Sequence, residues 1–175
     1  MERDNVLGHR FKVLESLSSL PKHILAFHNK DNVTEFVMHE LCGSGCFDLD
    51  KAAYLIDNPD FNCLRGIAGF SKDEAYGSTC SVWDAPEEFS AHMQKAAFNQ
   101  KVRGIAKESL RVKGKTDETL VREIAKNLGF NNPGFFSWEM KHDNHGLFIY
   151  QKNDLNGELE SLSDGLCYLG FCPVF

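Results

Sequence analysis

Long apolar runs are missing from this chain. No stretch approaches the ~20 apolar residues that a helix needs to cross a bilayer. The first residues are charged and contain no apolar run of signal-peptide length. We therefore expect a soluble protein of the cytoplasm without a membrane partner.

Blocks of like charge are also missing. The formal net charge is −6, but no five consecutive residues carry the same sign, so neither a basic arm nor an acidic tail is present. The most basic stretch, 101–115, has six Lys or Arg residues and one Glu, and it contains no aromatic residue on which a base could stack. The acidic balance and this lack of aromatics disfavour a nucleic-acid partner.

Repeats, low-complexity tracts and Pro/Ser-rich linkers are absent as well. The 175 residues, 42% hydrophobic and 25% charged, have the composition of a globular protein and the length of one domain. We therefore predict a single domain over residues 1–175. Its 14 Phe residues indicate a core rich in aromatic rings.

The N-terminal third of the chain has helical patterns. A 3.6-residue apolar stripe predicts a helix that ends at Pro21, and its members are Val13, Leu14, Leu17 and Leu20. A second helix is predicted from the N-cap residue Asn32 to about Cys42, with Gly43 as its stop.

Two further helices are predicted later in the chain. Pro86, followed by Glu87 and Glu88, is typical of a helix start, and that helix is expected to run to about Ile105. The clearest helical pattern covers residues 116–128, where an apolar stripe is closed by Gly129.

Strand patterns lie in the middle and toward the end. Residues 51–71 are predicted as two strands joined by a turn at 57–60, with a short helix in the first half as the alternative. Residues 135–141 and 147–151 alternate around a turn and predict a hairpin, and 166–175 is predicted as one more strand. The expected fold is therefore α+β, with N-terminal helices and an antiparallel sheet concentrated in the C-terminal part.

The segment from His39 to Cys46 is the main candidate for chemistry. His39 and Cys42 are three residues apart and should share a helix face, and the glycines that follow should let the chain fold back and bring Cys46 near both. An imidazole and two thiolates suit Zn²⁺. Glu35, one turn before His39, is a candidate fourth ligand or a group that orients the imidazole ring.

The remaining zinc ligands would have to come from elsewhere. Cys63, His142 and His145 are the weaker candidates. The competing interpretation is one buried cysteine and an exposed histidine at the cluster, with Cys63 and Cys80 as small buried apolar residues.

The same cysteines allow a thiol-dependent enzyme. Cys42 and Cys46 have a C-x₃-C spacing, but the C-terminal end of a helix raises the pKa of a nearby thiol, which disfavours a reactive thiolate.

Other catalytic motifs are incomplete. Gly114-Lys115-Thr116 resembles the end of a phosphate-binding loop, yet Ser109 stands where the first glycine belongs, and no G-x-S-x-G motif is present. The leading hypothesis is therefore a ligand-binding or protein-interaction module, with a protein or small molecule as its partner. The alternatives are a zinc-type protein or hydrolase that uses His39, Cys42 and Cys46, and a thiol-dependent enzyme.

Overall fold

The computed structural model describes residues 2–77, 79–152 and 159–173. The helices are α1 (Glu2–Phe27), α2 (Val33–Cys42), α3 (Pro86–Lys95), α4 (Ala97–Arg103), α5 (Glu118–Leu128) and α6 (Leu159–Leu166), with 3₁₀-helices η1 (Lys72–Glu74) and η2 (Cys167–Phe171). The strands are β1 (Lys51–Asn58), β2 (Cys63–Ser71), β3 (Ala106–Lys107), β4 (Arg111–Val112), β5 (Lys115–Thr116), β6 (Gly134–Glu139) and β7 (His145–Gln151).

The main sheet has five antiparallel strands in the order β3-β2-β1-β7-β6. Two predicted hairpins, β1–β2 and β6–β7, pair through β1 and β7, where Lys51 lies opposite Gln151 and Asp57 opposite His145. The α+β prediction is confirmed, and the sheet draws its strands from the middle of the chain as well as from its C-terminal part.

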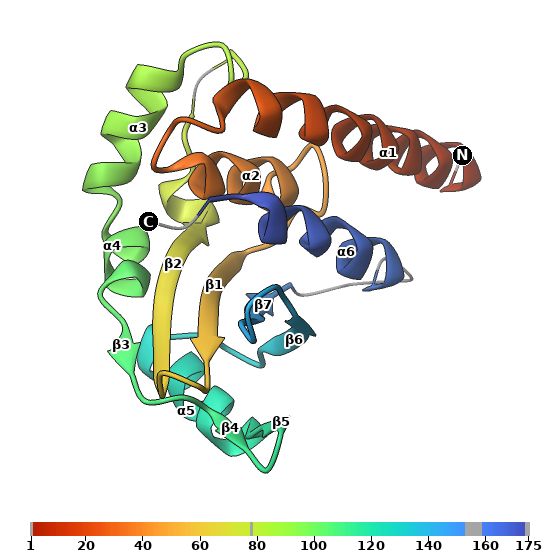
Figure 1. The fold of residues 1–175 in the computed structure, drawn as a ribbon. Helices are drawn as coiled ribbons and strands as arrows, with labels where there is room; N and C mark the ends of the chain where they lie inside the picture. Colours follow the sequence, from red (N-terminus) through yellow and green to blue (C-terminus); the bar gives the residue numbers. More distant parts are fainter. Residues whose placement is uncertain (1, 78, 153–158, 174–175) are drawn as a thin grey trace.

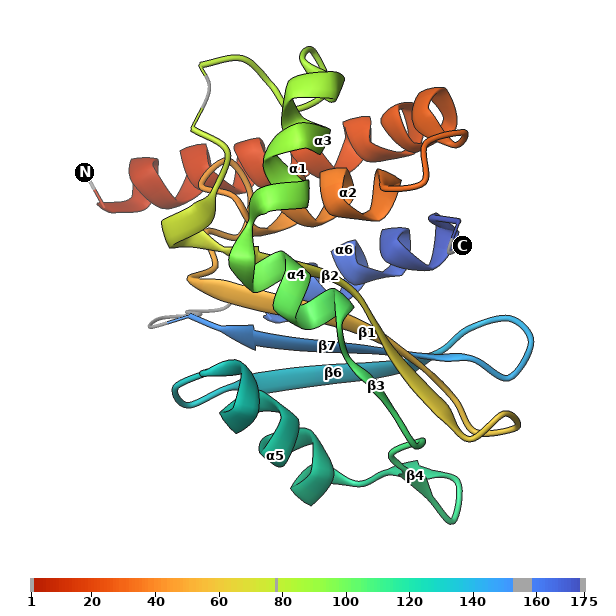
Figure 2. The same ribbon diagram turned by 90° about the vertical axis from the view of Figure 1, so that its left-hand side faces the viewer.

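Both faces of the sheet are covered. Because side chains alternate along a strand, Ala52 and Tyr54 of β1 enter one apolar cluster while Ala53 and Leu55 enter another. The first cluster includes residues of α1, α2, α3, α6 and η2, and the second includes residues of α4 and α5. Figures 1 and 2 show α1 and α2 on one side of the sheet and α5 on the other.

Helix α1 does not end at Pro21, as the sequence suggested, but continues to Phe27. A proline inside a helix costs about 3 kcal/mol. Leu20 and Ile24, on either side of Pro21, are buried in the first apolar cluster, and full burial of such a side chain is worth about 1.5–3 kcal/mol. Burial of Leu20 and Ile24 therefore offsets the free-energy cost of Pro21 in the helix.

Residues 86–103 form two helices instead of one. The chain is extended at Ala96 (φ −66°, ψ 110°), which separates α3 from α4. Phe89 and Met93 of α3 belong to the first apolar cluster, whereas Phe98 and Val102 of α4 belong to the second. One straight helix could not place its apolar residues in both clusters, so the break at Ala96 follows from the packing.

The predicted strand at 166–175 is wrong over its described part. Leu159–Leu166 forms α6 and Cys167–Phe171 forms η2; residues 174–175 lie outside the described part. Leu162, Leu166 and Leu169 are buried at helical spacing in the first apolar cluster. The apolar residues of this segment therefore cover α1 and α2 instead of pairing with the sheet.

Candidate functional site

A cavity of about 430 Å³ lies at the C-terminal end of α2. Its wall combines α2, the loop 43–49, the end of β2, η1 and the segment 75–82. Of the predicted site residues, His39 and Cys42 line this cavity, and the exposed Cys80 lines it too. The expectation that Cys80 is buried is wrong, because this segment runs along the surface.

His39 is buried, with 9% of its surface exposed, so the interpretation as an exposed histidine is also wrong. Its Nε2 accepts a hydrogen bond from the Tyr76 backbone N–H at 3.3 Å. Its ring lies edge-on to Phe70 and Phe89, at centroid distances of 5.0 and 4.7 Å. Burial and the nearby imidazole of His92 lower the pKa of His39 to about 4, and the Glu35 backbone carbonyl offsets part of that decrease. The imidazole is therefore neutral near pH 7.

Cys42 and Cys46 are both buried. The chain folds back after α2 as expected, because the backbone N–H of Phe47 bonds to Leu41 O and that of Leu49 bonds to Cys42 O. Burial, together with the neighbouring Cys46, raises the pKa of the Cys42 thiol well above its ordinary value. Cys42 is a protonated thiol at neutral pH, which disfavours it as a nucleophile.

The weaker zinc candidates lie far from this cluster. Cys63 and His145 stand at the other end of the sheet, roughly 20 Å away along the strands, and His142 lies in the exposed β6–β7 turn. Within the described residues, no group of three or more His, Cys, Asp and Glu side chains is arranged to hold a metal ion. The zinc site therefore stays a prediction that this geometry does not support.

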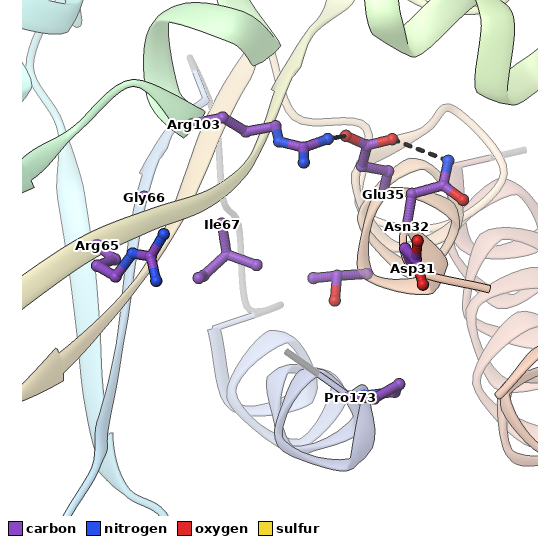
Figure 3. Close-up of a pocket in the computed structure, with 9 residues that line it drawn as sticks. Asp31, Asn32, Glu35, Arg65, Gly66, Ile67, Arg103 and Pro173 are labelled. Atoms are coloured by element: carbon purple, nitrogen blue, oxygen red, sulfur yellow. Dashed lines mark hydrogen bonds and ion pairs between the residues drawn. The ribbon is translucent and has the colours of Figure 1, made fainter. Parts of the chain in front are cut away.

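A smaller polar cavity of about 110 Å³ lies at the opposite end of α2 (Figure 3). There the Glu35 carboxylate, 3% exposed, accepts hydrogen bonds from three donors. Oε1 lies 2.8 Å from both Arg103 Nη1 and Asn99 Nδ2, and Oε2 lies 3.0 Å from Asn32 Nδ2. Glu35 therefore joins α2 to α4, and its carboxylate is engaged here instead of at the His39 ring.

A large apolar surface lies on α1. Alternating steps of four and three residues place six exposed residues on one helix face, here called the outer seam: Leu7, Phe11, Leu14, Ser18, Pro21 and Leu25. Leu7, Phe11, Leu14 and Leu25 expose 54%, 70%, 62% and 72% of their surface. The inner stripe of the same helix, with Val13, Leu20 and Ile24, is buried against the body. Helix α1 is thus apolar on two sides.

The outer seam runs into an apolar hollow of about 490 Å³ between α1 and η2. We call it the α1–η2 hollow; its lining residues are Pro21, Ile24, Leu25, His28, Tyr168 and Phe171. Phe171 exposes 73% of its surface at the rim. The predicted stripe of Val13, Leu14, Leu17 and Leu20 mixes the two sides of α1, because Leu14 is 62% exposed on the outer seam whereas Val13 and Leu20 are buried. The 4-3 spacing was the signal that could have revealed the outer seam.

No protein family matches the sequence, and no curated protein or solved structure matches the chain. Among the described helices, none combines the length and apolar character needed to span a membrane.

Proposed function

We propose that this protein is an interaction module that binds a partner helix along the outer seam and in the α1–η2 hollow. The observation that carries the proposal is the row of four large apolar side chains on α1, each more than half exposed, that leads into an apolar hollow. Helices of globular proteins normally bury their apolar stripes. A second stripe on the outside indicates a surface that is covered in use.

The size of the patch supports this proposal. Leu7, Phe11, Leu14, Leu25 and Phe171 together expose on the order of 600 Å² of apolar side chain, taking large side chains at about 150–250 Å² each. This area reaches the upper end of the roughly 300–600 Å² typical of the largest patch on a monomer. Apolar anchors beside a pocket are also how amphipathic helices are recognised.

Photo-crosslinking tests the proposed function. A photoreactive amino acid at Leu25 or Phe171, in cells that make the protein, should yield one discrete adduct of reproducible mass. The same amino acid at Phe61, which is 82% exposed at the β1–β2 turn, provides the control. Phe11→Glu should abolish the adducts from Leu25 and Phe171. Equal labelling from all three positions, or none, would contradict the interaction module.

A second candidate function is favoured by the cavity beside His39. Its volume of about 430 Å³ lies within the range of roughly 300–1,000 Å³ of small-molecule sites. The neutral imidazole of His39, the thiol of Cys42 and the ion pair between Lys72 and Asp48 (2.9 Å) give its wall a few polar groups. A thermal-shift screen of small polar compounds, with His39→Phe as the control variant, tests this candidate. Stabilisation that survives in His39→Phe would place the ligand elsewhere.

The zinc hypothesis for His39, Cys42 and Cys46 has its own test. Metal analysis of protein purified without chelators should give close to one zinc per chain if the site exists. Less than ~0.2 zinc per chain would count heavily against it.

A further inference from the structure

We infer that the occupant of the outer seam is a second copy of this chain, with the two α1 helices packed antiparallel about a twofold axis. This inference rests on the proposed function, because it names the partner of the same surface.

The outer seam carries projecting side chains at one end and a hollow at the other. Leu7 and Phe11 lie in the N-terminal half of α1, which extends beyond the other elements in Figures 1 and 2. The α1–η2 hollow borders the C-terminal half, and Leu25 stands about 27 Å along the helix from Leu7. Antiparallel packing places Leu7 and Phe11 of each copy against the hollow of the other. A twofold interface of this kind is self-complementary and closes on itself.

The spacing of the seam fits helix–helix packing. Steps of four and three residues keep all six positions facing one partner, as in the seam of a coiled coil. The small side chain of Ser18, near the middle of the seam, lets two helices approach closely where they cross. The seam thus has the period expected when a second helix packs along its length.

The area favours a second copy over a short segment that fills only the hollow. A stable interface buries about 800 Å² per partner, and the five apolar side chains supply on the order of 600 Å². Only an occupant that covers both ends of the seam approaches this requirement. A segment confined to the hollow would leave Leu7 and Phe11 in water.

The charges of α1 disfavour a membrane surface as the occupant. Helices that lie on anionic lipid are typically rich in Lys and Arg. Helix α1 has four basic residues against three acidic ones, namely Arg3, Arg10, Lys12 and Lys22 against Glu2, Asp4 and Glu15. The whole chain is acidic, with a net charge of −6.

Sedimentation velocity of the purified full chain over a concentration series tests the inference. The mass should rise from 19.7 kDa to twice that value as concentration increases. Phe11→Glu should raise the dissociation constant by at least about tenfold, because it places a charge in the apolar interface. Phe61→Glu, a matched change of an exposed phenylalanine outside the seam, should leave it unchanged.

Charge exchange then tests the antiparallel orientation. Leu7→Lys and Leu25→Glu should each weaken self-association, and a mixture of the two chains should restore it by pairing the two new charges. A mixture of Leu7→Lys with Leu7→Glu should not restore it. If the mixture of Leu7→Lys with Leu7→Glu restored self-association instead, the two α1 helices would be parallel. That result would overturn the antiparallel arrangement.

A wild-type chain that stays at 19.7 kDa at every concentration would overturn the inference. So would a monomer that binds phosphatidylcholine–phosphatidylserine vesicles through Phe11, which would identify lipid as the occupant. Neither result removes the interaction module if the crosslinks from Leu25 and Phe171 persist to a different protein. Loss of those crosslinks is the separate result that contradicts the module itself.

Discussion

At the scale of single residues, His39 is a polar side chain that is buried in the folded protein. Its ring is enclosed by Phe70, Phe89 and the backbone of Tyr76, which come from three other segments. Protonation of the ring would place a positive charge in this apolar setting and beside His92. The folded protein therefore favours the neutral form of the His39 imidazole.

The first prediction concerns acid stability. Because the pKa of His39 falls from 6.5 when unfolded to about 4 when folded, the unfolded chain binds the proton more tightly. The contribution of His39 to stability is therefore retained above pH 6.5 and lost as the pH decreases toward 4. About 2 kcal/mol of unfolding free energy should be lost through this residue between pH 8 and pH 5.

Denaturant unfolding of wild type and His39→Phe at both pH values measures this contribution. The variant should show a smaller loss than wild type by about that amount, and His39→Gln serves if the larger ring does not fit. The control is His142→Asn in the exposed turn, where φ is +61° and asparagine is tolerated. Identical pH dependence in His39→Phe and wild type would rule out a buried neutral His39.

The second prediction concerns thiol reactivity. Cys42 is buried with a raised pKa, whereas Cys167 is exposed. Alkylation of the native protein near pH 7 should modify Cys167 rapidly and Cys42 only after unfolding. Mass spectrometry of the digested protein reports both rates. If Cys42 reacted as fast as Cys167, and did so at pH 6, the thiol-dependent enzyme would gain support.

At the scale of elements, the contact between β2 and α4 sets how that helix lies on the sheet. The Gly69 N–H donates to Asn99 Oδ1 at 2.9 Å, and the Gly66 N–H donates to Ile105 O at 3.0 Å. A Cβ atom on Gly66 would lie 1.8 Å from the Val102 carbonyl oxygen. Two glycines thus let helix backbone approach strand backbone, and Asn99 then reaches on to Glu35 of α2.

The third prediction tests this contact with Gly66→Ala. The added methyl group collides with backbone, which cannot move aside as a flexible side chain would. The free energy of unfolding should therefore decrease by about 1–3 kcal/mol or more. Gly45→Ala is the matched control, since a Cβ there meets nothing within 4 Å, and it should change stability by less than about 0.5 kcal/mol. Equal melting temperatures for the two variants would contradict the close approach.

At the scale of the whole molecule, α1 separates what folds the chain from what we propose it binds. Its inner stripe is part of the first apolar cluster, together with α2, α6 and η2. The large apolar residues of its outer seam are exposed and are not part of that cluster. Stability and association should therefore respond to different residues of one helix.

The fourth prediction compares one leucine from each stripe. Leu20→Ala, at a fully buried position, should lower the free energy of unfolding by about 2–5 kcal/mol. Leu14→Ala, at a position 62% exposed, should change it by less than about 0.5 kcal/mol in dilute protein. The order should reverse for self-association, which Leu14→Ala should weaken. A large loss of stability from Leu14→Ala in the dilute monomer would mean that the seam belongs to the core.

Elements whose signals are local could be predicted from the amino-acid sequence. Asp117 caps α5 by accepting hydrogen bonds from Thr119 and Leu120, and Gly129 ends it in the left-handed conformation at φ +78°. The hairpin at 51–71 follows in the same way from a turn signal between two apolar segments, and the hairpin at 134–151 from alternation around a turn. In each case the residues that decide the structure are a few positions apart.

The other features depend on tertiary contacts between segments that are distant in the sequence. The helix through Pro21, the break at Ala96 and the helical form of 159–171 all depend on which face of the sheet their apolar residues cover. Burial of His39 needs Phe70 and Phe89, and the Glu35 carboxylate forms an ion pair with Arg103, 68 residues away. The outer seam is visible as a spacing, but its exposure follows from the packing of α1 on the body through its inner stripe.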